Sequence, residues 1–207
     1  MSAYGNGDYA TALRLYRPLA DKGNAEAQYN LGFMYDKGQG VPQDYAVAVK
    51  WYRLAADQGD AYAQVNLGVM YKKGQGVPQD YAAAMKWYRL AADQGNAKAQ
   101  TNLGFMYYNG QGVLQDSAAA VKWCRLAADQ GDDAAQYNLG VMYEKGQGVP
   151  QDYIQAHKWW NLAAVAGDKD AIKNRDIVAG KMTPAQIAEA QKLAREWKPK
   201  RRIRAMP

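Results

Sequence analysis

The fold follows from one stretch of sequence that the chain repeats, Ala25-Glu26-Ala27-Gln28-Tyr29-Asn30-Leu31-Gly32-Phe33-Met34-Tyr35. Close copies begin at Ala61, Ala97 and Asp133, each 36 residues after the one before. The continuation Gly38-Gln39-Gly40-Val41-Pro42-Gln43-Asp44 recurs at the same offset, with one substitution, Leu114, in the third copy. Repetition at a fixed period of this length indicates a repeat architecture built from one small unit.

Each repeat is predicted to form two helices. A side chain with an oxygen acceptor stands before each predicted helix, where it can bind the free amides of the first turn. These residues are Asn24, Asp60, Asn96, Asp132 and Asp168 before the first helices, and Asp44, Asp80, Asp116 and Asp152 before the second helices. Gly38 and its copies follow the first helix, where glycine favours the left-handed conformation that ends a helix.

The apolar residues of each repeat follow a helical period and indicate a buried stripe. Ala27, Leu31 and Met34 lie on this stripe in the first helix, and Gly32 beside them indicates close approach by Trp51 or Tyr52. A helix pair of this size cannot bury its apolar face alone, so the pairs must stack on one another. The spacing therefore predicts an all-α solenoid.

The repeated motif A-x-A-Q-x-N-L-G-x-M-Y followed by G-Q-G-V and K-W-Y-R-L-A-A-D-Q-G resembles the Sel-one-like repeat (SLR), a relative of the tetratricopeptide repeat. The resemblance covers roughly residues 7 to 179. It implies a right-handed α/α superhelical solenoid that acts as a protein-interaction adaptor, with its partner on the concave side. Many bacterial members are exported, so a periplasmic or secreted location is implied.

Some exported SLR proteins carry a Cys pair in every repeat and are linked to penicillin binding or β-lactam hydrolysis. This subgroup offers an alternative function as an exported enzyme related to β-lactams or the cell wall. The chain departs from it because Cys124 is its one cysteine. A serine enzyme of that type needs a Lys three residues after its Ser, and Ala120 stands there after Ser117.

The ends of the chain differ from its middle. Residues 1–23 are expected to hold the second helix of a truncated N-terminal repeat, and residues 24–167 hold four full repeats. Residues 168–197 are expected to form C-terminal capping helices, and residues 198–207 a basic, disordered tail. The unpaired helix at the start suggests a natural protein that is longer at its N-terminus, with any export signal upstream.

Composition argues against several classes of protein. The 207 residues include one Cys and one His, which excludes an internal disulfide and the usual zinc sites. No signal peptide, membrane-spanning run or phosphate-binding loop is recognisable. Residues 195–207 supply +5 of the net charge of +6, so the repeats are nearly neutral. We expect no catalytic residues, no metal, no cofactor and no small-molecule substrate.

Positions that differ between repeats indicate where a partner could bind, because packing does not dictate them. Their helical spacing places them on one stripe of the first helices, and the stripe mixes aromatic, aliphatic and charged side chains. An ordinary half-solvated face is the alternative. The stripe comprises Tyr29, Phe33, Tyr62, Val69, Lys72, Lys98, Phe105, Tyr108, Tyr137 and Val141.

One asparagine recurs on or beside this stripe in every repeat. The set is Asn30, Asn66, Asn102, Asn138 and Asn174. A side-chain amide both donates and accepts, which suits the backbone of an extended peptide. The alternative is that each asparagine bonds to the adjacent repeat and fixes the stacking angle.

The remaining conspicuous residues have simpler interpretations. His157 takes the place of Val49 and is expected to be a packing substitution, while Cys124 is expected to be an inert replacement for an aromatic ring. The basic tail offers weak potential for nucleic acid or an anionic membrane, with a solubilising role as the alternative. Its cations are Lys198, Lys200, Arg201, Arg202 and Arg204.

Overall fold

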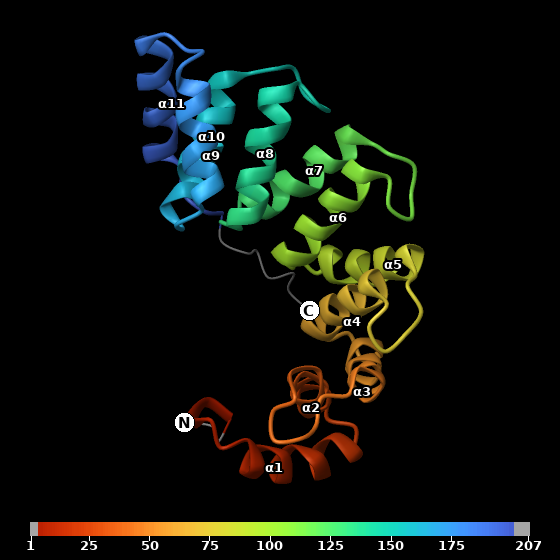
Figure 1. Cartoon of the computed structure of the whole chain (residues 1–207). Coiled ribbons are helices and arrows are strands. Elements are labelled where there is room, and N and C mark those ends of the chain that lie inside the picture. The colour runs from red at the N-terminus through yellow and green to blue at the C-terminus, as the bar shows by residue number, and fades with distance from the viewer. Residues whose placement is uncertain (1–3, 201–207) are drawn as a thin grey trace. The chain divides into compact units, whose positions relative to one another are not determined.

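The computed structural model describes residues 4–200, and within this range the chain is helical with no strand (Figure 1). A single 3-10 turn spans Tyr4–Asn6. The α-helices are α1 (Tyr9–Asp21), α2 (Ala25–Lys37), α3 (Tyr45–Asp57), α4 (Ala61–Lys73), α5 (Tyr81–Asp93), α6 (Ala97–Asn109), α7 (Ser117–Ala128), α8 (Asp133–Lys145), α9 (Tyr153–Val165), α10 (Lys169–Ala179) and α11 (Pro184–Glu196).

The helices divide into two compact units. Unit 1 spans Met1–Asn96 and holds α1 to α5, and unit 2 spans Ala97–Pro207 and holds α6 to α11. Within each unit every helix packs on the helix that follows it, except that α11 packs on α9. We call α2, α4, α6, α8 and α10 the first helices, and α1, α3, α5, α7 and α9 the second helices.

The predicted caps set the helix boundaries. Asn24 accepts a hydrogen bond from the Ala27 amide at 2.8 Å, and Asp44 accepts one from the Val47 amide at 3.0 Å. Gly38 ends α2 in the left-handed conformation, with φ of 66°. The same caps are confirmed at Asp60, Asp80, Asp116, Asp132, Asp152 and Asp168, and the same glycine conformation is found at Gly74, Gly110 and Gly146.

A close helix contact explains the glycine in the middle of α2, α4, α6 and α8. Gly32 lies under the ring of Tyr52, and a Cβ atom at Gly32 would stand 2.7 Å from Tyr52 Cδ1. No such space exists for a side chain, so glycine is needed there despite its cost of about 0.5–1 kcal/mol in a helix. The prediction of close approach is confirmed, and Tyr52 rather than Trp51 is the contacting ring. The equivalent pairs are Gly68 with Tyr88, Gly104 with Cys124, and Gly140 with Trp160.

Cys124 and His157 are both buried, as expected for packing residues. Cys124 is fully buried against Gly104, and burial raises the pKa of its thiol to about 12. The thiol is therefore protonated at neutral pH and a poor nucleophile. His157 is 3% exposed, and burial followed by nearby Arg175 lowers the pKa of its imidazole below the usual value, against an opposing effect of Asp176.

Buried glutamines join neighbouring repeats, a feature that the sequence analysis did not single out. Gln64 is 3% exposed and donates from Nε2 to the Ala56 carbonyl at 3.1 Å. Its Oε1 accepts from Gln94 Nε2 at 2.9 Å, so one amide connects α3, α4 and the end of α5. Equivalent bonds join Gln58 to Gln28, Gln28 to Ala20, Gln130 to Gln100, and Gln136 to Ala128.

The C-terminal helices cover the last repeat. Helix α11 begins with a capping box between Thr183 and Gln186, as predicted, and packs on α9. Trp197, which follows it, packs against the apolar cluster of α7 and α8. The chain then continues to Lys200, whose Nζ lies 2.7 Å from Asp129 Oδ2 and whose amide donates to the Asp129 carbonyl at 2.7 Å.

Lys200 therefore differs from the expectation of a free tail that begins at residue 198. The ion pair and the backbone hydrogen bond together hold this residue against the end of α7. The remaining predicted tail cations, Arg201, Arg202 and Arg204, lie outside the described residues, and Lys198 is exposed. Within the described range, no helix is both long enough and apolar enough to span a bilayer.

Candidate partner-binding surface

Pockets lie between successive first helices in both units. In unit 1 one pocket of about 360 Å³ lies between α2 and α4. In unit 2 a pocket of about 100 Å³ lies between α6 and α8, and one of about 310 Å³ lies between α8 and α10. The three pockets occupy equivalent places in the repeat, so the stacking of helix pairs generates them.

The predicted site residues line these pockets unevenly. Asn66 and Val69 line the pocket between α2 and α4. In unit 2, Phe105, Tyr108, Asn138 and Val141 line the pocket between α6 and α8, and Tyr137, Val141 and Asn174 line the pocket between α8 and α10. The structure thus gathers many of the predicted residues at the junctions of first helices. The predicted residues that line none of these three pockets are Tyr29, Asn30, Phe33, Tyr62, Lys72, Lys98 and Asn102.

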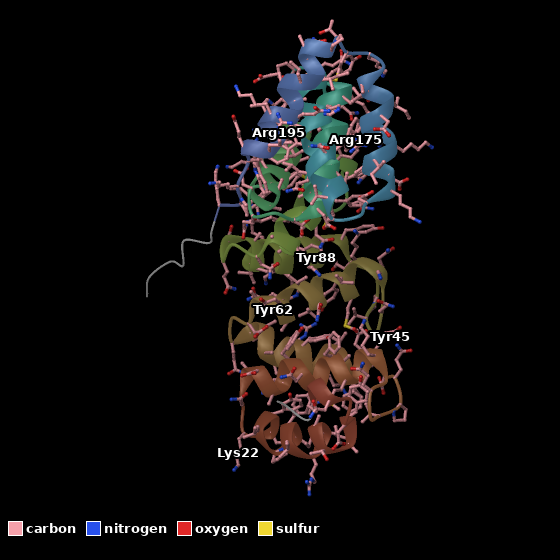
Figure 2. The ribbon with its side chains drawn as sticks, turned by 90° about the vertical axis from the view of Figure 1, so that its left-hand side faces the viewer. Lys22, Tyr45, Tyr62, Tyr88, Arg175 and Arg195 are labelled. Atoms are coloured by element: carbon pink, nitrogen blue, oxygen red, sulfur yellow. The ribbon has the colours of Figure 1, made fainter. Side chains whose placement is uncertain are left out.

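An aromatic cluster lies on α2 and α4 in unit 1. The ring centroid of Tyr29 lies 6.4 Å from that of Phe33 and 6.1 Å from that of Tyr62. Tyr62 is 60% exposed on α4 (Figure 2), so the cluster reaches the surface. Lys37 Nζ lies 5.5 Å from the Phe33 ring centroid, a cation–π distance. An exposed aromatic cluster beside a cation is a surface that can pack against another chain.

The two predicted lysines differ in environment. Lys72 is half-buried at the end of α4, and burial, followed by the charge of Lys73, lowers the pKa of its ammonium group. Lys98 is exposed near the start of α6, where its carbonyl accepts a hydrogen bond from Asn102 Nδ2 at 2.9 Å.

The asparagine set separates into two groups. Asn102 bonds within its own helix, and Asn174 donates to the Tyr137 hydroxyl of the preceding repeat at 3.2 Å. Within residues 4–200, the side-chain amides of the other three make no hydrogen bond, although each residue is half-buried. These three are Asn30, Asn66 and Asn138.

Residues other than these asparagines therefore form most of the side-chain hydrogen bonds between neighbouring repeats. Of the five asparagines, only Asn174 bonds to an adjacent repeat within residues 4–200, whereas Gln64 in unit 1 and Gln136 in unit 2 both form such bonds. The signal was present in the sequence, because Gln28 and its copies recur unchanged beside the core residues Ala27 and Leu31. An invariant amide on a buried stripe indicates a satisfied internal hydrogen bond.

The described residues offer little to metal or nucleophilic chemistry. No group of three or more His, Cys, Asp or Glu side chains is close enough to hold a metal ion within residues 4–200.

Two polar residues that line the apolar pocket between α6 and α8, Tyr108 and Asn109, form hydrogen bonds with other parts of the chain. Tyr108 donates to Gln147 Oε1 at 2.6 Å, and Asn109 donates to the Phe105 carbonyl at 2.8 Å. Asn138 also lines this pocket, and within residues 4–200 its side-chain amide makes no hydrogen bond.

Comparison with protein families identifies the repeat. The model of the Sel1 repeat matches residues 2–24, 25–60, 61–96, 97–132 and 133–168. The chain belongs to the Sel1 repeat family. This match confirms the resemblance to the SLR proteins, and proteins built from Sel1 repeats typically serve as non-enzymatic scaffolds for protein interaction.

Solved structures of other Sel1 repeat proteins share the fold. A protective antigen of uropathogenic Escherichia coli strains, which displays an SLR fold, is 39% identical over 89% of this chain with a TM-score of 0.84. The chain spans only 40% of the length of that antigen. A Sel1 repeat protein from Oxalobacter formigenes is 33% identical with a TM-score of 0.81, and the match covers 94% of this chain and 79% of that protein.

A third solved structure is less similar to this chain in sequence and in fold. An immunity protein from Pseudomonas aeruginosa is 25% identical with a TM-score of 0.53, and the match covers 89% of this chain and 70% of that protein. The search among proteins with curated functions gave no match. The similar structures confirm the predicted all-α solenoid class.

Proposed function

We propose that this Sel1 repeat chain is a non-catalytic scaffold that holds an extended segment of a partner protein along its first helices. One observation carries the proposal. The half-buried amides of Asn66 and Asn138 line the junction pockets and make no hydrogen bond within the described chain. Because these amides are only half-buried, water can satisfy them in the free protein, and a ligand in the pocket can take the place of that water.

The chemistry of an extended backbone matches what these amides offer. Each asparagine can donate to a carbonyl and accept from an amide of the same strand. Because the asparagine recurs once in each repeat, successive repeats within one unit would bind the same segment at intervals. The variable residues around it, such as Phe105 and Val141, would then select side chains of the partner.

A peptide selection tests this proposal. A displayed library of random peptides is selected on the full wild-type chain, and the recovered peptides are measured against the Asn66→Ala and Asn138→Ala double variant. We expect the double variant to bind the recovered peptides about 5-fold to 150-fold more weakly, since each lost amide contact contributes about 0.5–1.5 kcal/mol and the two together about 1–3 kcal/mol. Thermal unfolding should remain close to that of the wild type.

Gln136→Ala is the matched control. It also removes one amide from α8, but Gln136 is buried and donates to the Ala128 carbonyl. This control should lower the melting temperature. The proposed function fails if the double asparagine variant binds the peptides like the wild type, or if it loses stability as Gln136→Ala does.

A further inference from the structure

The junction pocket between α2 and α4 differs in charge from the equivalent pocket between α6 and α8. It is lined by Asp36, Lys37 and Lys73 among other polar residues. The pocket between α6 and α8 has Tyr108 and Asn109 at the positions of Asp36 and Lys37, and its lining carries no charged side chain. The pocket between α8 and α10, three repeats after the first, is also charged, since Glu144 and Lys145 line it.

That later pocket shows how a carboxylate fits this site. Glu144 stands at the position of Asp36, and Lys181 stands at the position of Lys73. Lys181 Nζ lies 2.8 Å from Glu144 Oε1, and this hydrogen bond raises the pKa of the lysine. A carboxylate at this junction is therefore within reach of Lys181, which lies two residues beyond the end of α10.

In the pocket between α2 and α4, Lys73 forms no ion pair with Asp36, the residue equivalent to Glu144. Asp36 has one methylene fewer than glutamate, and its carboxylate lies 2.8 Å from Lys37 Nζ on the same helix. The Asp36 side chain is 17% exposed and already neutralised. Among residues 4–200, no acidic side chain forms an ion pair with Lys73, which is exposed at the end of α4.

Asn66 supplies a second hydrogen-bond donor at the pocket between α2 and α4. Asn66 lines the pocket together with Lys73, and its amide makes no hydrogen bond within the described chain. An ammonium group and a neutral amide suit one carboxylate, whose two oxygens accept both hydrogen bonds. The pocket holds two lysines and one aspartate, so its charge complements an acidic group.

We propose that the pocket between α2 and α4 binds a carboxylate of the partner segment through Lys73 and Asn66. This proposal rests on the proposed function, because it names the chemistry of the partner at one junction. The carboxylate can be an acidic side chain or the C-terminus of the partner, and the pocket recognises the chemistry that both share. The competing explanation is that Lys73 only stabilises the negative end of α4, a role common for lysines in a last helical turn.

Three fluorescent peptides of equal length test the proposal by anisotropy with the full chain. The first alternates Gly and Glu and has an amidated C-terminus, the second alternates Gly and Gln with the same amide, and the third alternates Gly and Gln with a free C-terminal carboxylate. Each is measured with the wild type, with Lys73→Gln and with Lys50→Gln. Lys50 is exposed on α3 and lines no pocket described here, so its variant loses the same charge elsewhere.

We expect the wild type to bind at least one carboxylate peptide about tenfold more tightly than the amidated Gln peptide, which corresponds to about 1.4 kcal/mol. Which of the two shows the preference identifies the source of the carboxylate. Lys73→Gln should remove most of the preference, and Lys50→Gln should keep it within about twofold, since a distant exposed charge is screened by salt.

Three results overturn the proposal. They are equal binding of all three peptides by the wild type, equal loss with Lys73→Gln and Lys50→Gln, and no binding of any peptide at millimolar concentration. Lower stability of Lys73→Gln with the preference intact supports the helix-end role instead. The proposed function is judged separately, because the selected peptides and the asparagine variants need no carboxylate.

Discussion

Replacing Gln64 by Glu tests the stacking of the repeats most directly. The change keeps the shape of the side chain but removes its only donor group. Gln64 is 3% exposed and donates to the Ala56 carbonyl at 3.1 Å, while Gln94 donates to its Oε1 at 2.9 Å. An ionised carboxylate keeps the bond from Gln94 and faces the Ala56 carbonyl with a second acceptor.

The magnitude follows from the contacts that change. Loss of the bond to Ala56 costs about 1 kcal/mol, and the new carboxylate oxygen, buried without a donor, costs a further 1–3 kcal/mol. The Ala56 carbonyl itself still accepts from the Gly59 amide at 3.0 Å. The stronger bond from Gln94 to a charged acceptor offsets about 1 kcal/mol of this. Desolvation of the charge adds to the loss. We therefore expect Gln64→Glu to reduce the free energy of unfolding by about 3 kcal/mol at neutral pH.

The loss should depend on pH in a defined direction. Burial raises the pKa of the introduced carboxyl in the folded state above its unfolded value of about 4.3. A loss of 3 kcal/mol corresponds to a shift of about two pKa units. The variant is therefore least stable above the raised pKa, and it recovers as the pH falls towards about 4.3, because the protonated acid can again donate to Ala56.

Urea unfolding followed by circular dichroism at about pH 7 and about pH 4.5 measures both effects. Gln94→Glu is the matched control, since Gln94 is the exposed partner in the same hydrogen bond and should lose less than about 1 kcal/mol. The reasoning is refuted if Gln64→Glu unfolds within about 0.5 kcal/mol of the wild type at neutral pH, or if its deficit is the same at both pH values.

Three further predictions concern the core. Gly68→Ala should lower the melting temperature, because its Cβ would lie 2.7 Å from Tyr88 Cε1. The steric cost of about 1–3 kcal/mol exceeds the gain in helix propensity. Gly59→Ala is the control for backbone strain alone, since no atom lies near its Cβ but its φ is 92°. Cys124, with a thiol pKa of about 12, should react with a thiol reagent only after unfolding, and rapid labelling of the native chain would contradict its burial. His157→Val should reduce the loss of stability as the pH falls below about 6.5, since the wild-type imidazole has a lowered pKa when folded; unchanged pH dependence in unfolding experiments would exclude this residue as the cause.

The repeats and helix caps were predictable because they depend on local chemistry. Asp44 caps α3 through a bond to an amide three residues away, and Gly38 ends α2 through its own backbone conformation. Such interactions lie within one turn of the chain, and the 36-residue period repeats them. The close contact at Gly32 was also expected, but the choice of Tyr52 over Trp51 depends on the rotation of α3 against α2.

The candidate surface was only partly predictable. Variation between repeats placed Val69, Phe105 and Val141 on the stripe, and the structure places them at junction pockets. The role of Asn66 was left open, because a sequence does not show whether a half-buried amide has a partner. The buried amide of Gln64 was predictable from its unchanged recurrence beside core residues, but its partners Ala56 and Gln94 follow only from the packing of the helices.

The sequence by itself determined the repeat, the helix boundaries and the residues that packing leaves free to vary, because these follow from local capping and periodicity. Tertiary structure alone decided which side-chain amides have hydrogen-bond partners and which of Lys73 and Lys181 forms an ion pair with the acidic residue at its junction. Glu144 reaches Lys181 across one pocket, whereas Asp36 pairs with Lys37 on its own helix. Lys181 lies two residues beyond the end of α10, whereas Lys73 is the last residue of α4, so only the folded helices show which carboxylate each lysine can meet.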